Sequence, residues 1–451
     1  MKKFYLVFLF LGVLTGFVSS CSDDDKYDAP ELEIVSVDGA FAVAKEDTLI
    51  LKAKLNHSQE TMLSWTINGK EVCTDSVYMF IAEEMGNYKI NVKATNAGGE
   101  ASANTSIEVY GKYKYGTFVL NEGQLWKDHA GTLVFISPKG IVTDSVYYKE
   151  NGGILGFATQ DLYIKNNKLY IISQEGGNDG GFLTITNAET LKQEHTYHEE
   201  LGNKLNDPTH IAVLNEDDIY IRDSKGISRF TPSSNTLTFI EGSSRANKTT
   251  MAVAEGKIFA IQSNKLLVIE AGKSSISKEI TASGSISGVL PSSDGNIWFA
   301  CKANGEESAK IIKLNAQNYS IQENPIEDKT AASILNGGWN ATPYITAKGD
   351  TLYMGSGNKP MPVYRHIFSQ KKTELMGNMA EGLDHVTTLY NCIAVHPITG
   401  DVYANIISSY GLDPENKTCV FNFSNDKLML KANYKGHTES PAGIFFTYNF
   451  E

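Results

Sequence analysis

The sequence predicts an all-β protein, and three observations support this prediction. Apolar segments of strand length recur along the chain, and clusters of Gly, Asn and Asp separate them. The region after residue 30 has these strand signals and no helical periodicity. From Gly116 onward, an aliphatic–aromatic–aliphatic strand returns at intervals of 39 to 55 residues, and this spacing is typical of the blades of a β-propeller.

The first 21 residues predict a lipid anchor. Lys2 and Lys3 precede an apolar stretch at 4–18, which is too short to span a bilayer but suits a signal peptide. The stretch ends in Val-Ser-Ser-Cys, which resembles a bacterial lipobox with Cys21 as the lipidated residue. We therefore expect a signal peptide at 1–20 and a tether at 21–29, with an ordinary cleavable leader as the alternative. The acidic residues at 23–25 resemble the signal that exports Bacteroidetes lipoproteins to the cell surface.

Residues 30–111 predict a small β-sandwich. The segment 63–67 carries Trp65 and runs into Asn68-Gly69, which is a strong hairpin turn. A strand with clean alternation follows Gly86 and contains Tyr88. A core Trp and a Tyr before a late strand resemble an immunoglobulin-like or PKD-type domain. Both aromatic residues are therefore expected in the core, with ligand stacking as the alternative.

Residues 112–451 predict a seven-bladed β-propeller. The recurring second strands centre on six aromatic residues, and residues 117–120 supply a seventh unit; the six are Tyr170, Tyr220, Phe259, Trp298, Tyr353 and Tyr403. A four-stranded blade cannot bury either of its faces alone, so these aromatic side chains are expected between neighbouring blades. Residues 443–448 have no unit of their own, and we expect them to pair with the first blade and close the ring.

Composition excludes several classes of partner. The formal net charge is −12, with 40 basic against 52 acidic residues, so nucleic acid and anionic lipid are repelled. Only four of the basic residues are arginines, which disfavours polyanionic ligands. No two of the five cysteines form a CxxC pair. Cys392 and Cys419 are expected as buried thiols, with a disulfide between them as the alternative.

Catalytic and metal motifs are missing from the sequence, so we expect a binding protein without a cofactor. There is no G-x-S-x-G, no H-E-x-x-H and no phosphate-binding glycine loop. The segment 292–298 approximates a sialidase Asp-box and also resembles the blades of streptogramin lyases. A lyase would need a metal and a general base near the propeller axis, and it remains the enzymatic alternative.

Candidate ligand-binding residues are expected at the mouth of the propeller. Ten residues before the second-strand aromatics, the sequence places polar and mostly uncharged side chains, which include Gln160, Asp161, His210 and Asn391. Two loops add aromatic and polar groups, because a Trp in a loop is a common anchor of recognition. These are Trp126 and His129 in the first loop, and Trp339, Asn340 and Tyr344 in the second. His129 and His210 have no spacing partner for a metal, so both are expected as hydrogen-bonding surface residues.

The opening of the second region resembles a known family. Residues 117–123, 131–135, 146–152 and 160–163 look like the first blades of YncE-like surface propellers of Bacteroidetes. That group includes the BtuG-type lipoproteins, which capture vitamin B12 and pass it to a TonB-dependent outer-membrane transporter. The resemblance implies a surface-exposed outer-membrane lipoprotein that binds a cobamide as a ligand. A glycan- or protein-binding scaffold is the main alternative.

Overall fold

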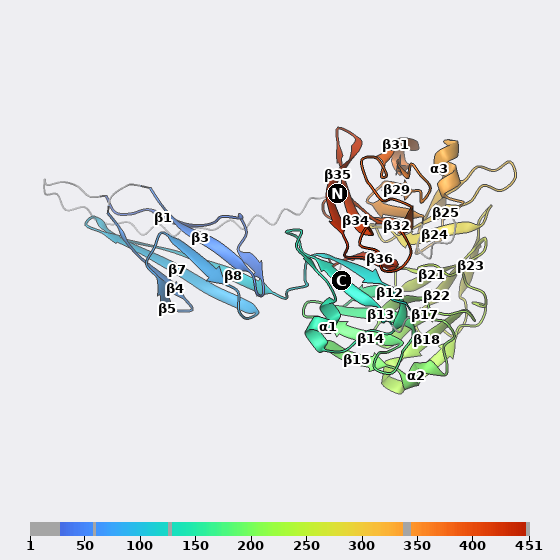
Figure 1. The fold of residues 1–451 in the computed structure, drawn as a ribbon, viewed down its shortest axis with the longest axis horizontal. Helices are drawn as coiled ribbons and strands as arrows, with labels where there is room; N and C mark the ends of the chain where they lie inside the picture. Colours follow the sequence, from blue (N-terminus) through green and yellow to red (C-terminus); the bar gives the residue numbers. More distant parts are fainter. Residues whose placement is uncertain (1–27, 57–59, 125–128, 337–343, 448–451) are drawn as a thin grey trace. The chain divides into compact units, whose positions relative to one another are not determined.

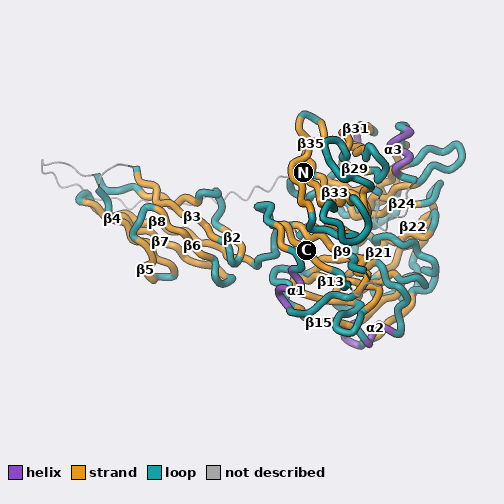
Figure 2. The backbone as a smooth tube through the Cα atoms, viewed as in Figure 1, coloured by secondary structure: helices purple, strands orange, loops and turns teal. Residues whose placement is uncertain are grey.

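The computed structural model describes residues 28–56, 60–124, 129–336 and 344–447, and the chain forms two compact units, Met1–Tyr110 and Gly111–Glu451. The expected lipidation site Cys21 and the loop residues Trp126, Trp339 and Asn340 lie outside the described residues. Strands dominate both units, as the orange segments of Figure 2 show. The all-β prediction is confirmed.

The first unit is a β-sandwich (Figure 1). One sheet has the order β1-β3-β6, with β1 at Leu32–Ser36, β3 at Thr48–Leu55 and β6 at Val77–Ile81. The other has the order β2-β8-β7-β4-β5, with β2 at Ala42–Ala44, β8 at Gly99–Tyr110, β7 at Gly86–Asn96, β4 at Met62–Ile67 and β5 at Lys70–Cys73. Buried residues of both sheets meet in one apolar cluster.

Trp65 and Tyr88 have structural roles in this unit. Trp65 is fully buried, and its indole Nε1 donates a 2.8 Å hydrogen bond to the Asp75 carbonyl. The Tyr88 hydroxyl donates to the carbonyl of Glu84, four residues earlier, at 2.8 Å, which is the bond of a tyrosine corner. The expectation of two core aromatics rather than a ligand platform is confirmed by these contacts.

The second unit repeats a four-stranded antiparallel sheet. Within its described residues there are seven such sheets, whose strands follow one another in this spatial order: β11 (Val142–Thr143), β10 (Thr132–Ile136), β9 (Thr117–Asn121) and β36 (Pro441–Phe446); β12 (Phe157–Lys165), β13 (Lys168–Glu175), β14 (Leu183–Asn187) and β15 (Gln193–Tyr197); β16 (His210–Asn215), β17 (Asp218–Arg222), β18 (Ile227–Thr231) and β19 (Thr236–Phe239); β20 (Ala252–Ala254), β21 (Lys257–Gln262), β22 (Lys265–Glu270) and β23 (Lys278–Thr281); β24 (Ile286–Pro291), β25 (Ile297–Cys301), β26 (Lys310–Leu314) and β27 (Ile321–Pro325); β28 (Ile345–Lys348), β29 (Thr351–Gly355), β30 (Pro362–Ile367) and β31 (Lys372–Asn378); β32 (Thr388–Val395), β33 (Val402–Ile407), β34 (Lys417–Ser424) and β35 (Lys427–Lys435).

One terminal strand of each sheet faces a common axis. Each of β12, β16, β20, β24, β28, β32 and β36 contacts the next in this order, and β36 contacts β12 again. We call these seven the inner strands. The last of them, β36, joins the first sheet by pairing with β9, so red and cyan strands lie together in Figure 1. The expected pairing of the C-terminal strand with the first unit is confirmed, and the fold is propeller-like.

Short hairpins join each inner strand to the second strand of its sheet. Between β12 and β13 the turn is Asn166-Asn167, and both residues have positive φ, at 49° and 59°. Asn tolerates this left-handed conformation better than other residues with a side chain do, and two consecutive positive φ values match the right-handed twist of the flanking strands. These turns lie at the end of each inner strand that is opposite to its first residue.

The recurring aromatics pack between sheets, as expected. Tyr170, Tyr220, Phe259 and Trp298 are at most 1% exposed, and Tyr353 is 8% exposed. Trp298, for example, meets Phe368 of the next sheet edge-on, with 4.8 Å between ring centroids. Tyr403 is half-buried against Phe446. Strands buried on both faces, such as β25, read as continuous apolar runs for this reason.

Three short α-helices interrupt the strand pattern within the described ranges: α1 at Val146–Asn151, α2 at Glu199–Gly202 and α3 at Lys329–Ile334. None was predicted from the sequence, because one turn or two of helix is too short to show a 3.6-residue period. In the described part of the chain, no helix has the length and apolar character needed to cross a membrane. Short 3-10 turns occur at Pro232–Ser234 and Phe368–Gln370.

Cys419 is a free, buried thiol, and burial raises its pKa to about 12. This agrees with the expectation of a packed thiol. The side chain of Cys392 is outside the described residues.

Candidate functional site

The candidate residues gather at one face of the second unit. The first residues of the inner strands point to the same side, because these strands all run in one direction relative to the axis. The connections from β9 to β10 and from β33 to β34 lie on this side too, since each leaves the end of a second strand that is beside the start of an inner strand. We call this side the mouth face.

Glu122 lies at the centre of a polar cluster on the mouth face. Its carboxylate accepts a 3.2 Å hydrogen bond from the Tyr390 hydroxyl and a further one from the Gln160 side chain. Its backbone N–H donates to Ser440 O at 3.1 Å, and its carbonyl accepts from Thr159 N at 2.9 Å. Three inner strands, β12, β32 and β36, therefore fix the position of this partly exposed carboxyl group.

Two carboxyl groups of this region titrate near neutrality. Burial raises the pKa of Glu122 to about 7, against the opposing effects of the Lys248 cation and of the Tyr390 and Gln160 hydrogen bonds. Burial likewise raises the pKa of Asp161 to about 7, although the N–H groups of Ile211 and Leu162 lower it. At neutral pH each group is present both as a carboxylate and as a carboxylic acid. Glu122 is thus able to accept or donate a hydrogen bond.

An aromatic platform adjoins Glu122. The Tyr410 side chain is 74% exposed, and its ring lies 6.0 Å from that of Tyr390, tilted at 70°. Leu412, on the same β33–β34 connection, is 66% exposed. An exposed aromatic ring beside fixed hydrogen-bonding groups is a common arrangement for stacking a flat or ring-shaped ligand. The sequence did not point to Tyr410, because no strand pattern marks that connection.

Asp161 and Asn391 line a cavity of about 190 Å³ on the axis, together with residues of β24, β28 and β36. Both lie beside β-bulges, which redirect side chains. The Asn391 amide donates to the Pro441 and Ala442 carbonyls at 2.7 and 2.8 Å. The Asp161 oxygens accept from Leu162 N and Ile211 N at 2.9 and 3.1 Å. These predicted ligand-binding residues therefore join neighbouring sheets, and they reach only the interior of the channel.

The other predicted residues are distributed differently. Gln160 is 8% exposed and reaches the mouth through its bond to Glu122. His210 is 1% exposed with Nδ1 2.9 Å from Thr209 Oγ1, so the expectation of a surface histidine is wrong. The reason is that its strand begins under the neighbouring sheet, which sequence spacing does not show. Tyr344 is half-buried against the apolar cluster around Trp298.

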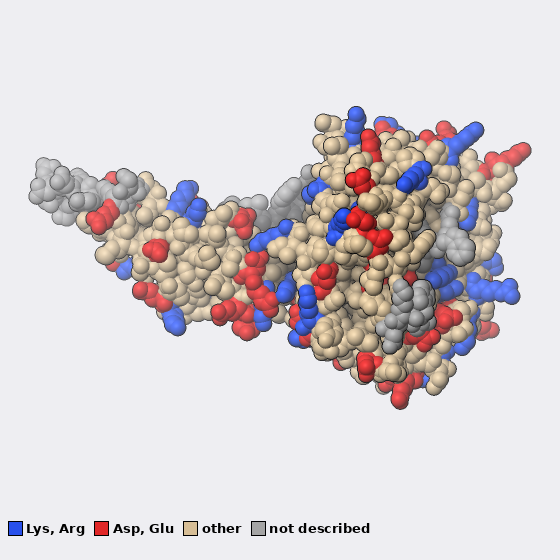
Figure 3. Space-filling model, viewed as in Figure 1, with Lys and Arg blue, Asp and Glu red and all other residues tan. Residues whose placement is uncertain are grey.

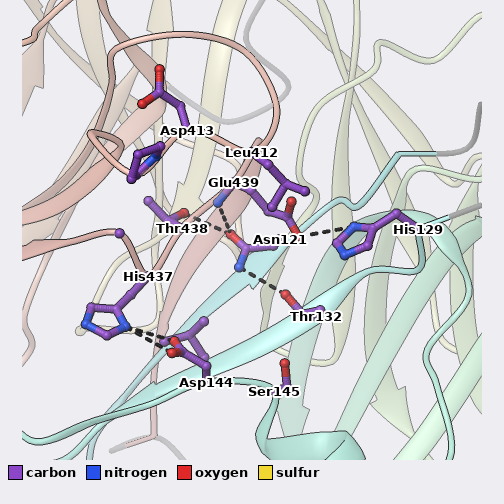
Figure 4. Close-up of a pocket in the computed structure, with 13 residues that line it drawn as sticks. Asn121, His129, Thr132, Asp144, Ser145, Leu412, Asp413, His437, Thr438 and Glu439 are labelled. Carbon is purple, nitrogen blue, oxygen red and sulfur yellow. Dashed lines mark hydrogen bonds and ion pairs between the residues drawn. The ribbon is translucent and has the colours of Figure 1, made fainter. Parts of the chain in front are cut away.

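His129 lies apart from the axis, in a pocket between the first and last sheets (Figure 4). Its Nδ1 is 3.3 Å from Glu439 Oε1, and its side chain is 39% exposed. Across the pocket His437 Nδ1 is 3.0 Å from Asp144 Oδ1. Throughout the described ranges, no group of three or more His, Cys, Asp or Glu side chains is arranged to hold a metal ion.

Charge on the visible surface is mixed. Figure 3 shows Lys and Arg side chains interspersed with Asp and Glu on the face that it presents. At the mouth, the acidic Glu122 is accompanied by the exposed Lys248. The chemistry available there is therefore hydrogen bonding and ring stacking, with one carboxyl group and one ammonium group in reach.

Comparison with protein families identifies both units. Residues 115–447 match a family described as a domain of unknown function, DUF5074. The chain belongs to the DUF5074 family. Residues 29–96 match the PKD-like domain, in agreement with the sandwich expected at 30–111. No curated protein matches this DUF5074 chain.

Solved structures resemble the DUF5074 chain in fold. A quinonprotein alcohol dehydrogenase-like protein from Bacteroides thetaiotaomicron is 16% identical, with a TM-score of 0.56 over 90% of this chain and 96% of the other. A puromycin-hydrolyzing peptidase of Mycobacterium tuberculosis is 8% identical, with a TM-score of 0.45 over 76% of this chain and 51% of the other. The first likeness supports the propeller-like fold, and neither defines an activity.

Proposed function

We propose that this DUF5074 protein binds a nutrient ligand at the mouth face and hands it to a TonB-dependent outer-membrane transporter. The specific candidate is a cobamide such as vitamin B12. In this proposal the seven sheets are the blades of a closed propeller, and a lipid on Cys21 anchors the chain to the outer membrane with the mouth at the cell surface. No catalytic step is part of the proposal.

One observation carries the binding role: Glu122, fixed by three inner strands, lies beside the exposed Tyr410 ring through Tyr390. An exposed Tyr ring gains little for the fold, and a desolvated carboxyl group beside it is costly, so the pair is typical of a recognition site. Preorganised polar groups next to an aromatic surface lower the entropic cost of binding.

A cobamide suits these groups in size and chemistry. The axial cavity of about 190 Å³ is too small for a corrin ring, so the ring would lie over the mouth. Its amide arms carry both N–H donors and carbonyl acceptors, and Glu122 matches either because its pKa is about 7. The Tyr410 ring would pack on the apolar part of the ligand.

Calorimetry tests this proposal. The soluble fragment from Ser22 is titrated with cyanocobalamin and with cobamides that differ in the lower base, while the visible absorption of the corrin is recorded. We expect saturable heat and a spectral shift at micromolar concentration. Absence of both would overturn the cobamide assignment.

Variants at the mouth locate the site. Glu122→Ala is expected to weaken binding about tenfold, or ~1.4 kcal/mol, because a charge-assisted hydrogen bond is lost. Glu255→Ala is the matched control, since Glu255 is exposed on the β20–β21 hairpin at the opposite ends of the strands. Equal affinity of the two variants would place the ligand elsewhere.

Glycan binding is the second candidate, because an exposed Tyr ring is also a good platform for a sugar ring. A glycan array with the same fragment tests it. Retained glycan without cobamide binding, lost on Tyr410→Ala, would favour this candidate over the first.

A further inference from the structure

A second pocket lies where the last sheet meets the first, away from the axis (Figure 4). Its volume is about 430 Å³, which is in the range of small-molecule sites. Asn121 and Thr132 form one wall, Asp413 another, and the connection from β35 to β36 a third. We call it the seam pocket, because β36 closes the ring of sheets beside it.

The frame of the seam pocket is held by a saturated hydrogen-bond network. Asn121 Oδ1 accepts from Thr438 Oγ1 at 2.8 Å and from Glu439 N at 3.0 Å, while Asn121 Nδ2 donates to Thr132 Oγ1 at 3.1 Å. Asn121 and Thr438 are themselves buried. The backbone at Glu439 is therefore fixed in place.

Two carboxylates of the pocket already have partners. Asp144 lies 3.0 and 3.1 Å from His437 Nδ1 through its two oxygens. Asp413 Oδ2 accepts from Ser409 Oγ at 2.7 Å, and its Oδ1 accepts from Glu415 N at 2.8 Å. Neither needs a ligand to satisfy it.

Glu439 is the exception. It is only 6% exposed, yet its Oε2 has no hydrogen-bond partner among the described residues. His129 Nδ1 lies 3.3 Å from Oε1, but that nitrogen also makes no hydrogen bond within the described part of the chain. Buried carboxylates in proteins are almost always hydrogen-bonded. Rotation about the last bond of a Glu side chain is soft, so either oxygen can turn toward the pocket that Glu439 lines.

The charge of the pocket selects the missing donor. Its lining includes three carboxylic side chains, Asp144, Asp413 and Glu439, against two imidazoles, and no Lys or Arg is among the described residues that line it. A positively charged N–H donor would satisfy Glu439 and balance the excess of acid. A bare metal ion fits less well, because the carboxylates are not clustered as metal ligands in the described structure.

We propose that the seam pocket binds an organic ammonium group, with the Glu439 carboxylate as its acceptor. The unpartnered oxygen Oε2 takes the N–H bond of the ligand, while Oε1 stays beside the His129 imidazole. This site is independent of the proposed mouth ligand, and each stands or falls by its own measurement.

Ligand-observed NMR on the full chain tests the proposal, with propylammonium as the probe at pH 7.5. Uncharged 1-propanol and anionic propionate are the comparison probes. We expect saturable binding of propylammonium in the millimolar range and none of the other two. Glu439→Gln should lower the affinity about tenfold, because a charge-assisted hydrogen bond is lost. Equal binding of propanol, unchanged affinity in Glu439→Gln, or no binding of propylammonium would each overturn the proposal.

A second pair of variants keeps the test decisive if Glu439→Gln does not fold. Leu412 is 66% exposed and lines the pocket, so Leu412→Lys places a competing ammonium at its edge. Ile398 is 65% exposed on the β32–β33 hairpin, at the other ends of the strands. Leu412→Lys should weaken propylammonium binding, whereas Ile398→Lys, with the same change of charge, should not. Equal effects of the two would exclude the seam pocket as the site.

Discussion

The two units of the chain bury their strands in different ways. In the PKD-like unit, β3 alternates between exposed and buried residues over its first half, so one face of the sheet packs on the core and the other meets solvent. In the DUF5074 unit, all five residues of β25 are buried, because a neighbouring sheet covers each face. The sandwich is thus completed by one contact between sheets, whereas each sheet of the second unit depends on two neighbours. Polar groups at the ends of the inner strands are then forced into partly buried positions, and both candidate sites lie there.

Truncating one buried Trp in each unit tests whether the two cores are independent. Trp65→Ala and Trp298→Ala should each cost about 3–5 kcal/mol of unfolding free energy, because both side chains are fully buried. Calorimetry should show that each variant lowers the transition of its own unit and leaves the other unchanged. A shift of both transitions by either variant would show that the units are coupled.

The pH dependence of stability should distinguish the units as well. The pKa of Asp161 is raised in the folded state, so its contribution is full below the unfolded pKa, near 4, and is lost as pH rises through about 7. The size is on the order of 3 kcal/mol for a buried carboxyl group. Asp161→Asn should therefore become less destabilising relative to the parent chain between pH 4 and pH 7 in denaturant titrations. A difference that stays constant with pH would contradict the raised pKa.

Cross-links between sheets should matter more in the second unit. Asn391→Ala should lower its stability by about 2 kcal/mol, because two buried carbonyls lose their donor. Asn104→Ala is the control in the sandwich, since Asn104 is exposed and bonds only to Asn91 Nδ2 at 2.7 Å among the contacts described. Its expected cost in urea unfolding is below about 0.5 kcal/mol. Similar costs at the two positions would remove the contrast.

The smallest effect is expected at a surface ion pair of the sandwich. Lys54 Nζ lies 3.2 Å from Glu33 Oε2, with both side chains more than 60% exposed. Lys54→Met should change the unfolding free energy by less than about 0.5 kcal/mol, because solvent screens such pairs. A larger loss at moderate salt would mean that this edge of the sandwich has a role beyond the pair.

The sequence predicted the repeated sheets well because their cause is local. An aromatic residue such as Trp298 in the middle of an apolar run has to be buried on both sides, and this need recurs with every sheet. Asn68-Gly69 and the Tyr88 corner are local signals of the same kind. The short helix α1 gave no such signal, since six residues cannot establish a helical period.

The site was less predictable, because its groups meet across the ring. Counting back from second-strand aromatics reached Gln160 and Asp161, but it could not tell that the Asp161 oxygens are occupied by backbone N–H groups. It also failed for the first sheet, whose inner strand comes from the C-terminal part of the chain. Glu439 precedes that strand, and Glu122 meets Tyr390 from 268 positions away. No pattern within a single repeat contains these contacts.

The pairing of β36 with β9 also sets the order of events during synthesis. Residues 117–121 are made early, yet their inner neighbour, residues 441–446, emerges from the ribosome more than 300 residues later. Until then β9 presents an open edge that is prone to pairing with other chains. A nascent chain of this protein therefore has to be kept from aggregating until its final strand arrives, and loss of that strand to a protease would reopen the edge.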